Sequence, residues 1–297
     1  MRRGAGLLLA LAITAGACVP GGDEDAAAGE PGGALIIEQR TRATAPPTLF
    51  VLELGSLDLR PTTPDAVGAA AGRWSPDGSH VMWTEEFDDG ERDILIQGER
   101  DAEPTRVVGP GAETVAVWSP DCVRIAFARS DPDGDRGGLW VMDLDGSGVE
   151  QVTDGSRSDT AVDWSPMAER LVFMSDRGGD AEIVVIDVNG GNETVLTDNT
   201  VGDTWPRWSP DGGRIAWASR VNERKHVFVM DSDGGDVVQV TTGSQGGEFP
   251  VWSPDGEWIA YAQANSTIAI MRSDGSDRRV LDVTGTPTDW GPKTGEC

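Results

Sequence analysis

The sequence predicts an all-β fold, a six-bladed β-propeller with four antiparallel strands in each blade. The first observation is that the triplet Trp-Ser-Pro recurs five times, with spacings of 44, 46, 44 and 44 residues. The second is that short, β-branched runs and Asp-Gly or Asn-Gly turns fill the interval, without helical periodicity. A repeat of this length built from four short strands is typical of propeller blades. The five tryptophans are Trp74, Trp118, Trp164, Trp208 and Trp252.

Each full unit is expected to begin with the strand that carries the tryptophan. A Ser-Pro-Asp-Gly turn follows, in which Pro presets φ, Asp caps the turn and Gly takes the left-handed position. In the unit of Trp208 the next strands are "RIAWAS" (214–219), "VFVMD" (227–231) and "VVQVTT" (237–242). The tryptophan supplies an apolar plate between adjacent sheets. We therefore assign these tryptophans to packing.

The first blade is predicted to be assembled from both ends of the chain. Three runs, "LIIEQR" (35–40), "LFVLE" (49–53) and "LDLRPTT" (57–63), match the second, third and fourth strands of a unit. The missing first strand is "PTDWGPK" (287–293), with Trp290 in the tryptophan position. A C-terminal strand donated in this way closes the ring and removes its open edges. The count is then six blades rather than seven.

The N-terminal segment predicts export. Residues 1–17 are expected to be a signal peptide, residues 18–33 a flexible tether and residues 34–297 the propeller. Two alternatives stay open at the cleavage site, because Cys18 either carries a lipid anchor or simply follows the cleaved bond. Ala15 stands where bacterial lipoprotein signals usually have Leu, whereas the Gly, Pro and acid-rich stretch after Cys18 is typical of a tether. Both alternatives place the protein outside the cytoplasm, in a bacterial cell envelope or periplasm. Membrane contact is expected only through the anchor, if Cys18 carries it.

Charge and cysteine content restrict the partners. The formal net charge of −26 disfavours nucleic acid and anionic lipid, and it suits cations or basic partners. If Cys18 is lipidated, Cys122 and Cys297 remain as a pair in an oxidising compartment. Cys122 stands at the glycine position of its turn, and Cys297 trails the closing strand. A disulfide between them is one alternative, and two free thiols are the other.

No catalytic residue is predicted. The sequence has no nucleophile elbow, zincin, Cys-x-x-Cys or Walker motif, and His80 and His226 are expected at exposed blade positions. One loop, "DPDGDRGG", places Asp131, Asp133 and Asp135 at alternate positions, which calcium favours. The same loop lacks the glycine and the final carboxylate of an EF-hand. A solvated loop and a calcium site therefore both stay open, and no other cofactor is expected.

Two sets of residues are expected near the channel at the start of the innermost strands. The first set is acidic and enters these strands four or five residues before the tryptophan: Glu113, Asp159, Asp203 and Glu248. The second set is aromatic, Trp205 and Phe249, three residues before their tryptophans. An acidic ring would attract a cation or a basic peptide. Solvation of the acids is the alternative, and the aromatic pair could equally form a platform for a sugar.

The residue directly before each tryptophan shows a further pattern around the ring. Asp289 precedes Arg73 and Asp163 precedes Arg207 in neighbouring blades. We interpret these residues as ion pairs between blades.

The pattern "PxWSPDGxxIAxxS", followed by "xVFVMDxDGG" and "VTxG", resembles the TolB-type propeller repeat. The resemblance covers the chain beyond the tether and is closest at residues 205–243 and 249–256. The Trp-Asp dipeptide of WD-repeat blades is absent from the sequence. The resemblance implies an extracytoplasmic propeller that binds other proteins at a channel mouth. TolB places an α/β domain ahead of its propeller, where this chain has a short tether, so the partners of TolB are not carried over.

The sequence thus predicts a non-enzymatic, membrane-tethered monomer that binds an envelope protein or a basic peptide at an acidic channel mouth. The alternative is a propeller that binds a carbohydrate or small ligand, or a hydrolase built from blade loops.

Overall fold

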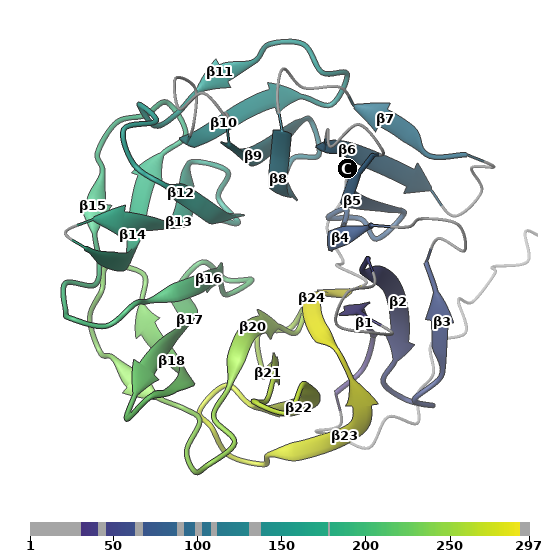
Figure 1. Cartoon of the computed structure of the whole chain (residues 1–297), viewed down its shortest axis with the longest axis vertical. Coiled ribbons are helices and arrows are strands. Elements are labelled where there is room, and N and C mark those ends of the chain that lie inside the picture. The colour runs from purple at the N-terminus through teal and green to yellow at the C-terminus, as the bar shows by residue number, and fades with distance from the viewer. Residues whose placement is uncertain are drawn as a thin grey trace, which may run out of the picture. The chain divides into compact units, whose positions relative to one another are not determined.

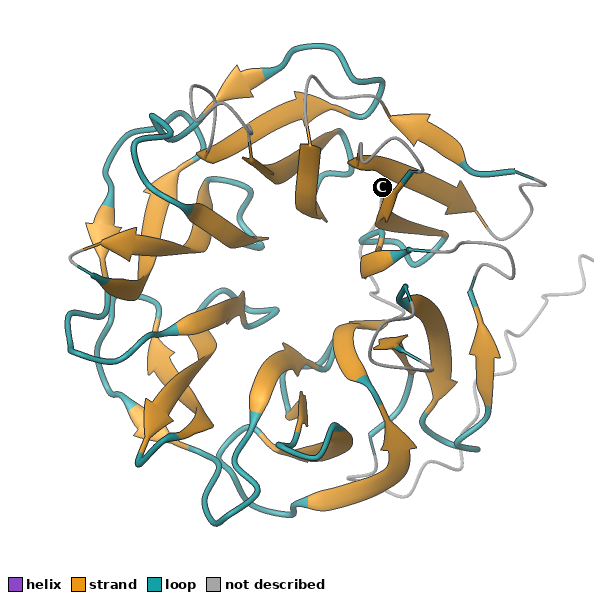
Figure 2. Ribbon diagram, viewed as in Figure 1, coloured by secondary structure: helices purple, strands orange, loops and turns teal. Residues whose placement is uncertain are grey.

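The computed structural model confirms the six-bladed propeller. It describes residues 31–40, 46–62, 68–87, 92–98, 103–107, 112–130, 138–177 and 179–291. These residues form strands and loops without a helix, and the six sheets stand in a ring around a central channel (Figure 1, Figure 2). Accordingly, the described part contains no helix long and apolar enough to cross a membrane. The predicted signal peptide and residues 18–30 of the predicted tether lie outside the described residues.

Blade 1 is built from both ends of the described chain, as predicted. Its sheet order is β24-β1-β2-β3. The strands of blade 1 are β1 (Ala34–Gln39), β2 (Thr48–Glu53), β3 (Leu59–Pro61) and β24 (Thr286–Gly291). Strand β24 pairs antiparallel with β1, and Leu35 lies opposite Trp290. The yellow β24 therefore lies beside the purple β1 at the inner edge of blade 1 (Figure 1).

Blades 2 to 6 each take four consecutive strands. Blade 2 contains β4 (Ala70–Trp74), β5 (His80–Glu86), β6 (Arg92–Gly98) and β7 (Thr105–Val107). Blade 3 contains β8 (Ala112–Trp118), β9 (Arg124–Ser130), β10 (Gly138–Asp143) and β11 (Glu150–Gln151). Blade 4 contains β12 (Asp159–Trp164), β13 (Arg170–Arg177), β14 (Asp180–Asp187) and β15 (Thr194–Val195). Blade 5 contains β16 (Thr204–Trp208), β17 (Arg214–Val221), β18 (Arg224–Asp231) and β19 (Val238–Gln239). Blade 6 contains β20 (Glu248–Trp252), β21 (Trp258–Ala262), β22 (Thr267–Arg272) and β23 (Arg279–Thr284).

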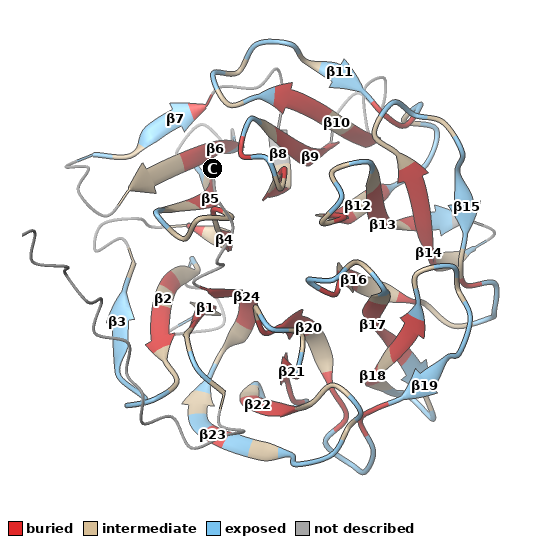
Figure 3. Cartoon of the chain, turned by 180° about the vertical axis from the view of Figure 1, so that it is seen from behind, coloured by how far each residue is buried: buried red, intermediate tan, exposed pale blue. Residues whose placement is uncertain are grey.

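The apolar core lies between blades. Each of the six hydrophobic clusters combines side chains from two neighbouring blades. The middle strands are buried, and the outermost strands β3, β11, β15 and β19 are exposed (Figure 3). The tryptophans belong to this core, since Trp164, Trp208 and Trp252 are 5%, 5% and 6% exposed. The blades are thus held together mainly by burial of apolar surface at their interfaces.

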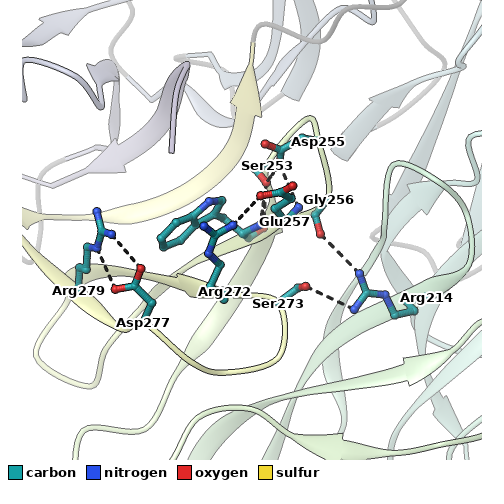
Figure 4. Close-up of polar contacts among 10 residues, drawn as sticks. Arg214, Ser253, Asp255, Gly256, Glu257, Arg272, Ser273, Asp277 and Arg279 are labelled. Carbon is teal, nitrogen blue, oxygen red and sulfur yellow. Dashed lines mark hydrogen bonds and ion pairs between the residues drawn. The ribbon is translucent and has the colours of Figure 1, made fainter. Parts of the chain in front are cut away.

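The repeated turn fixes the geometry after each inner strand. In blade 6 the Ser253 hydroxyl and the Glu257 backbone N–H donate to Asp255 Oδ1 at 2.5 and 2.9 Å (Figure 4). Gly256 adopts a φ of +70°, the left-handed conformation that glycine favours. Arg214 of blade 5 reaches this turn, because its guanidinium donates to the Gly256 carbonyl at 3.5 Å and stacks over Trp252 at 4.9 Å. The turn therefore joins neighbouring blades.

The same turn in blade 2 makes stability depend on pH. The hydroxyls of Ser75 and Ser79 and the Ser79 backbone N–H donate to the Asp77 carboxylate, and they lower the pKa of Asp77 from 3.8 to about 2. A carboxyl with a lowered pKa stabilises the folded state above its unfolded pKa, and this contribution is lost as the pH falls toward the folded pKa.

We therefore expect Asp77→Asn to lower the melting temperature at about pH 6 and to lower it less at about pH 2, because the wild-type carboxyl is then half protonated. Thermal unfolding of both proteins across this range measures the difference. The comparison cancels the general effect of acid on a chain with a charge of −26. A difference that does not change with pH would contradict the assignment.

Candidate functional site

A cavity of about 1000 Å³, here the wide cavity, opens where the innermost strands begin. Five blades contribute the residue three positions before their tryptophan: Ala71, Val115, Trp205, Phe249 and Pro287. These residues meet because every inner strand carries a β-bulge at this point. A bulge bends a strand and changes the direction of its side chains. The bulge is thus a device of the repeat that presents one residue per blade to the channel.

Trp205 and Phe249 form a pair on the wall of the wide cavity. Their ring centroids lie 4.8 Å apart and the ring planes are tilted by 47°. Their φ angles are +59° and +56°, which are unusual for large side chains. A left-handed conformation costs a residue other than glycine roughly 1–2 kcal/mol. Ala71, Val115 and Ala161 adopt it at the same position, so it is a feature of the bulge in this repeat. The predicted aromatic pair is therefore present, and it stands on a strained backbone.

Two arginines form the floor of the wide cavity. Arg73 is 3% exposed, and its Nη1 donates to the Thr288 carbonyl. Arg207 comes from blade 5, and its Nη2 donates to the same carbonyl at 3.4 Å. Side chains from blades 2 and 5 thus converge on a backbone oxygen of blade 1. This contact links three blades across the channel.

The crowding of charge at the floor changes the pKa of Arg73. Burial, and after it the nearby positive charge of Arg207, lower this pKa from 12.5 to about 9. The carboxylates of Asp289 and Asp163 oppose this shift. The charged form of Arg73 is therefore stabilised in part by these two carboxylates.

The opposite end of the channel holds a smaller cavity of about 410 Å³, here the tryptophan cavity. The tryptophan of every blade lines it, together with prolines of the turns and the carboxylates of Asp163 and Asp289. Asp163 Oδ1 lies 3.5 Å from Arg207 Nη1, which confirms this predicted ion pair between blades. Asp163 and Asp289 also each accept a hydrogen bond from the backbone N–H of the tryptophan in the next blade, at 2.8 Å. These contacts join blade 4 to blade 5 and blade 1 to blade 2.

The four predicted acids lie at or near the start of the inner strands, but the described side chains do not form a ring of free carboxylates. Asp159 is 5% exposed and accepts a hydrogen bond from the Ser175 hydroxyl at 2.5 Å. Asp203 is 1% exposed and accepts from Asn199 Nδ2 at 2.6 Å.

The other two acids differ from this pair. Glu248 forms an ion pair with Lys225 at 2.5 Å. The side chain of Glu113 lies outside the described part. Asp159, Asp203 and Glu248 are not among the described residues that line the wide cavity. Their role in binding stays a prediction.

Sequence comparison between blades missed the charged side chains that do line the wide cavity. Glu38, Glu85 and Glu86 belong to β1 and β5, and Arg40 and Arg92 accompany them. Arg92 pairs with Glu86 at 2.7 Å. Burial raises the pKa of Glu38, and the charge of Arg40 opposes that shift. These residues lie in or beside strands other than the inner strand, so aligning the blades on the tryptophan gives no signal for them.

The remaining predicted residues contribute little to the site. His226 was expected at the surface, but it is 6% exposed and its Nδ1 lies 3.0 Å from the Thr241 carbonyl, because it faces the fourth strand rather than solvent. The predicted calcium loop with Asp131, Asp133 and Asp135 lies outside the described residues. Within the described part, His, Cys, Asp and Glu side chains form no group of three or more that could hold a metal.

Cys122 occupies the glycine position of the turn in blade 3, with a φ of +58°. It forms a disulfide. Its predicted partner Cys297 lies outside the described residues, as does Cys18, so the pairing stays a prediction.

We expect loss of the Cys122 disulfide to lower the free energy of unfolding by about 2–4 kcal/mol. The Cys122→Gly variant should be more stable than the reduced wild type, because glycine adopts the left-handed conformation without the roughly 1 kcal/mol penalty. Denaturant unfolding of the oxidised wild type, the reduced wild type and the variant gives the order. Equal stability of the oxidised and reduced protein would contradict a stabilising bond.

Comparisons with known proteins agree with this architecture. Residues 158–294 match the family model described as the TolB beta propeller domain. The chain is similar to TolB from Acinetobacter baumannii, at 22% identity and a TM-score of 0.73, over 88% of this chain and 67% of that one. It is also similar to a putative TolB from Agrobacterium tumefaciens, at 21% identity and a TM-score of 0.66, over 87% and 91% of the two chains.

A third similar structure is a puromycin-hydrolyzing peptidase from Mycobacterium tuberculosis, at 18% identity and a TM-score of 0.62. The likeness covers 84% of this chain and 44% of the peptidase. At these identities the structural likeness concerns the fold alone.

Proposed function

We propose, from the premise that this chain carries a TolB-type propeller, that it is a non-enzymatic binding protein that holds a segment of a protein partner at the wide cavity. Propellers carry their binding sites at the ends of the channel because the loops and inner strands of all blades converge there. Both cavities of this chain lie at such positions. The wide cavity has the volume that a peptide segment requires.

The observation that carries the proposal is the Trp205–Phe249 pair on the wall of the wide cavity. Aromatic side chains dominate the energetics of protein interfaces. Both residues are half-buried and stand on left-handed backbone. The left-handed backbone belongs to the bulge of the repeat, since Ala71 and Val115 share it at the same position in other blades. What distinguishes blades 5 and 6 is the large aromatic side chain placed there. An apolar side chain of a partner would find an aromatic surface here.

The charge of the chain favours a partner with a basic surface. The formal net charge is −26, so the field around the ring attracts positive charge over long distances. In the wide cavity itself the carboxylates are accompanied by arginines, so this attraction comes from the charge of the whole chain. The described charged residues of the lining are Glu38, Glu85, Glu86, Arg40, Arg73, Arg92 and Arg207. We also propose that Glu113 and Glu248, at the channel mouth, contact such a partner.

We further propose that the chain works outside the cytoplasm, anchored through Cys18. The signal-like start of the sequence supports export, and the disulfide of Cys122 suits an oxidising compartment. Metabolic labelling with palmitate is expected to mark the wild type and leave Cys18→Ser unlabelled. Release of unlabelled wild type into the soluble fraction would contradict the anchor.

The test of the binding function is capture of a partner from a membrane-fraction extract of the source organism with the full chain as bait. We expect the double variant Trp205→Ala/Phe249→Ala to lose a protein that the wild type retains. Met167→Ala removes an exposed apolar side chain far from the wide cavity and is the matched control. Equal capture by all three baits would contradict binding at the wide cavity.

The aromatic pair also supports a second candidate, which is binding of a carbohydrate. Sugars stack on aromatic rings, and the pair is open to the wide cavity. A thermal-shift panel of sugars with wild type and Trp205→Ala separates this candidate from the first. A shift seen only in the wild type would favour the sugar.

A further inference from the structure

The two cavities differ in the charged residues that surround the arginines of the channel floor. Arg73 and Arg207 line both cavities. Their carboxylate neighbours Asp163 and Asp289 line the tryptophan cavity and are absent from the described lining of the wide cavity. The arginines therefore present positive charge to the wide cavity, while the carboxylates of Asp163 and Asp289 lie on the side of the tryptophan cavity.

Arg73 retains unused hydrogen-bonding capacity. A guanidinium has five N–H donors. Nη1 of Arg73 donates to backbone carbonyls, whereas its Nε is buried and has no hydrogen-bond partner. A buried donor without a partner is rare in folded proteins, so the described contacts do not satisfy Arg73 fully. Arg207 is more accessible, with 14% of its side chain exposed.

Arg207 lies close to one member of the aromatic pair along the chain. Trp205 lies two residues before Arg207 on β16, and both line the wide cavity. A bound group that contacts Arg207 therefore has the aromatic pair beside it. The site thus combines two cationic donors with an apolar wall.

We infer that the wide cavity binds a carboxylate of the partner polypeptide against Arg73 and Arg207, with a neighbouring apolar side chain against Trp205 and Phe249. This inference rests on the proposed function and names the part of the partner that enters the ring. The carboxylate has two sources, the free C-terminus of the partner or the side chain of an Asp or Glu near the aromatic residue.

A carboxylate suits this floor better than a more highly charged anion. It carries a single charge and accepts two parallel hydrogen bonds from a guanidinium. A phosphate would bring about two negative charges into a cavity that Glu38, Glu85 and Glu86 already line. The like charge of Arg207 lowers the pKa of Arg73, and a bound carboxylate would offset that repulsion.

The experiment measures fluorescence anisotropy of three labelled hexapeptides with the full chain. The first ends in Ala-Phe with a free carboxylate, and the second is the same peptide with a C-terminal amide. The third is amidated and carries Glu after Phe. We expect the first or the third peptide to bind about tenfold more tightly than the second, because its carboxylate accepts a charge-assisted hydrogen bond from an arginine. Tighter binding of the first indicates a chain end, and tighter binding of the third indicates a side chain.

Arg207→Gln is expected to abolish this preference, whereas Arg207→Lys should retain part of it. Arg170→Gln is the matched control, because Arg170 stacks over Trp208 at 5.3 Å without lining either cavity. Equal binding of all three peptides, including no binding of any, would overturn the inference. So would a preference that persists in Arg207→Gln. If partner capture still depends on Trp205 and Phe249 in that case, the proposed function stands and the inference alone fails.

Discussion

Replacing Trp290 with alanine is expected to lower the free energy of unfolding by about 3–5 kcal/mol, the usual cost of removing a buried tryptophan. Trp290 is 0% exposed and packs with Leu35 of β1 and Trp258 of blade 6. Its Nε1 also donates to the Gly32 carbonyl at 2.9 Å. The substitution therefore weakens both the closing strand and its interface with blade 6. Equilibrium unfolding in guanidinium chloride measures the loss.

The matched control is Trp205→Ala, which removes the same side chain from the channel wall. Trp205 is half-buried and its main described ring contact is Phe249. An aromatic pair contributes about 0.5–1.5 kcal/mol, so the expected loss is correspondingly small. Comparable losses for the two substitutions would contradict the distinction between a packing tryptophan and a binding tryptophan.

The Asp289→Ala variant is expected to lose about 3–5 kcal/mol, because it removes one partner from a buried charged group. Asp289 is 8% exposed, accepts a hydrogen bond from the Trp74 backbone N–H at 2.8 Å and stabilises the positive charge of Arg73. Without it, Arg73 stays buried beside Arg207 with less compensating charge. Urea unfolding of wild type and variant gives the difference.

A second substitution tests the electrostatic origin of this loss. Arg73→Met in the Asp289→Ala background removes the uncompensated charge and should recover part of the lost stability. Asp163→Ala, the equivalent change in blade 4, should cost less because its partner Arg207 is more exposed than Arg73. A double variant no more stable than Asp289→Ala alone would show that the lost hydrogen bond to Trp74 accounts for the effect.

The blade architecture could be predicted from the sequence because each blade repeats the same local chemistry. The Ser-Pro-Asp-Gly turn sets the end of the inner strand through bonds within five residues, as in the turn at Asp255. The turn even tolerates Cys122 and Ala168 at the glycine position, both with a φ of +58°. The donated strand was predictable because Trp290 repeats the same signal without a blade to follow.

The site could be predicted only in part. Alternation along a strand assigns side chains to faces, and one extra residue reverses the assignment. The bulge in the inner strand does this in every blade, and only blade 2 has a glycine there, Gly72, so no shared glycine marks it. As a result, Trp205 and Phe249 reach the channel as proposed, whereas Asp159 and Asp203 are buried and bonded within the rim. The charged residues of β1 and β5 join the cavity through tertiary contacts that no repeat records.

Because β24 pairs with β1, the chain could begin at a different blade without changing the order of the strands in the ring. Gly291 lies opposite Ala34, so the described chain begins and ends in the same sheet. A circular permutant that joins these ends and opens a turn between two other blades would keep all six interfaces. The chain ends would then lie on a different blade, so a segment attached to them could be placed at a chosen position around the ring.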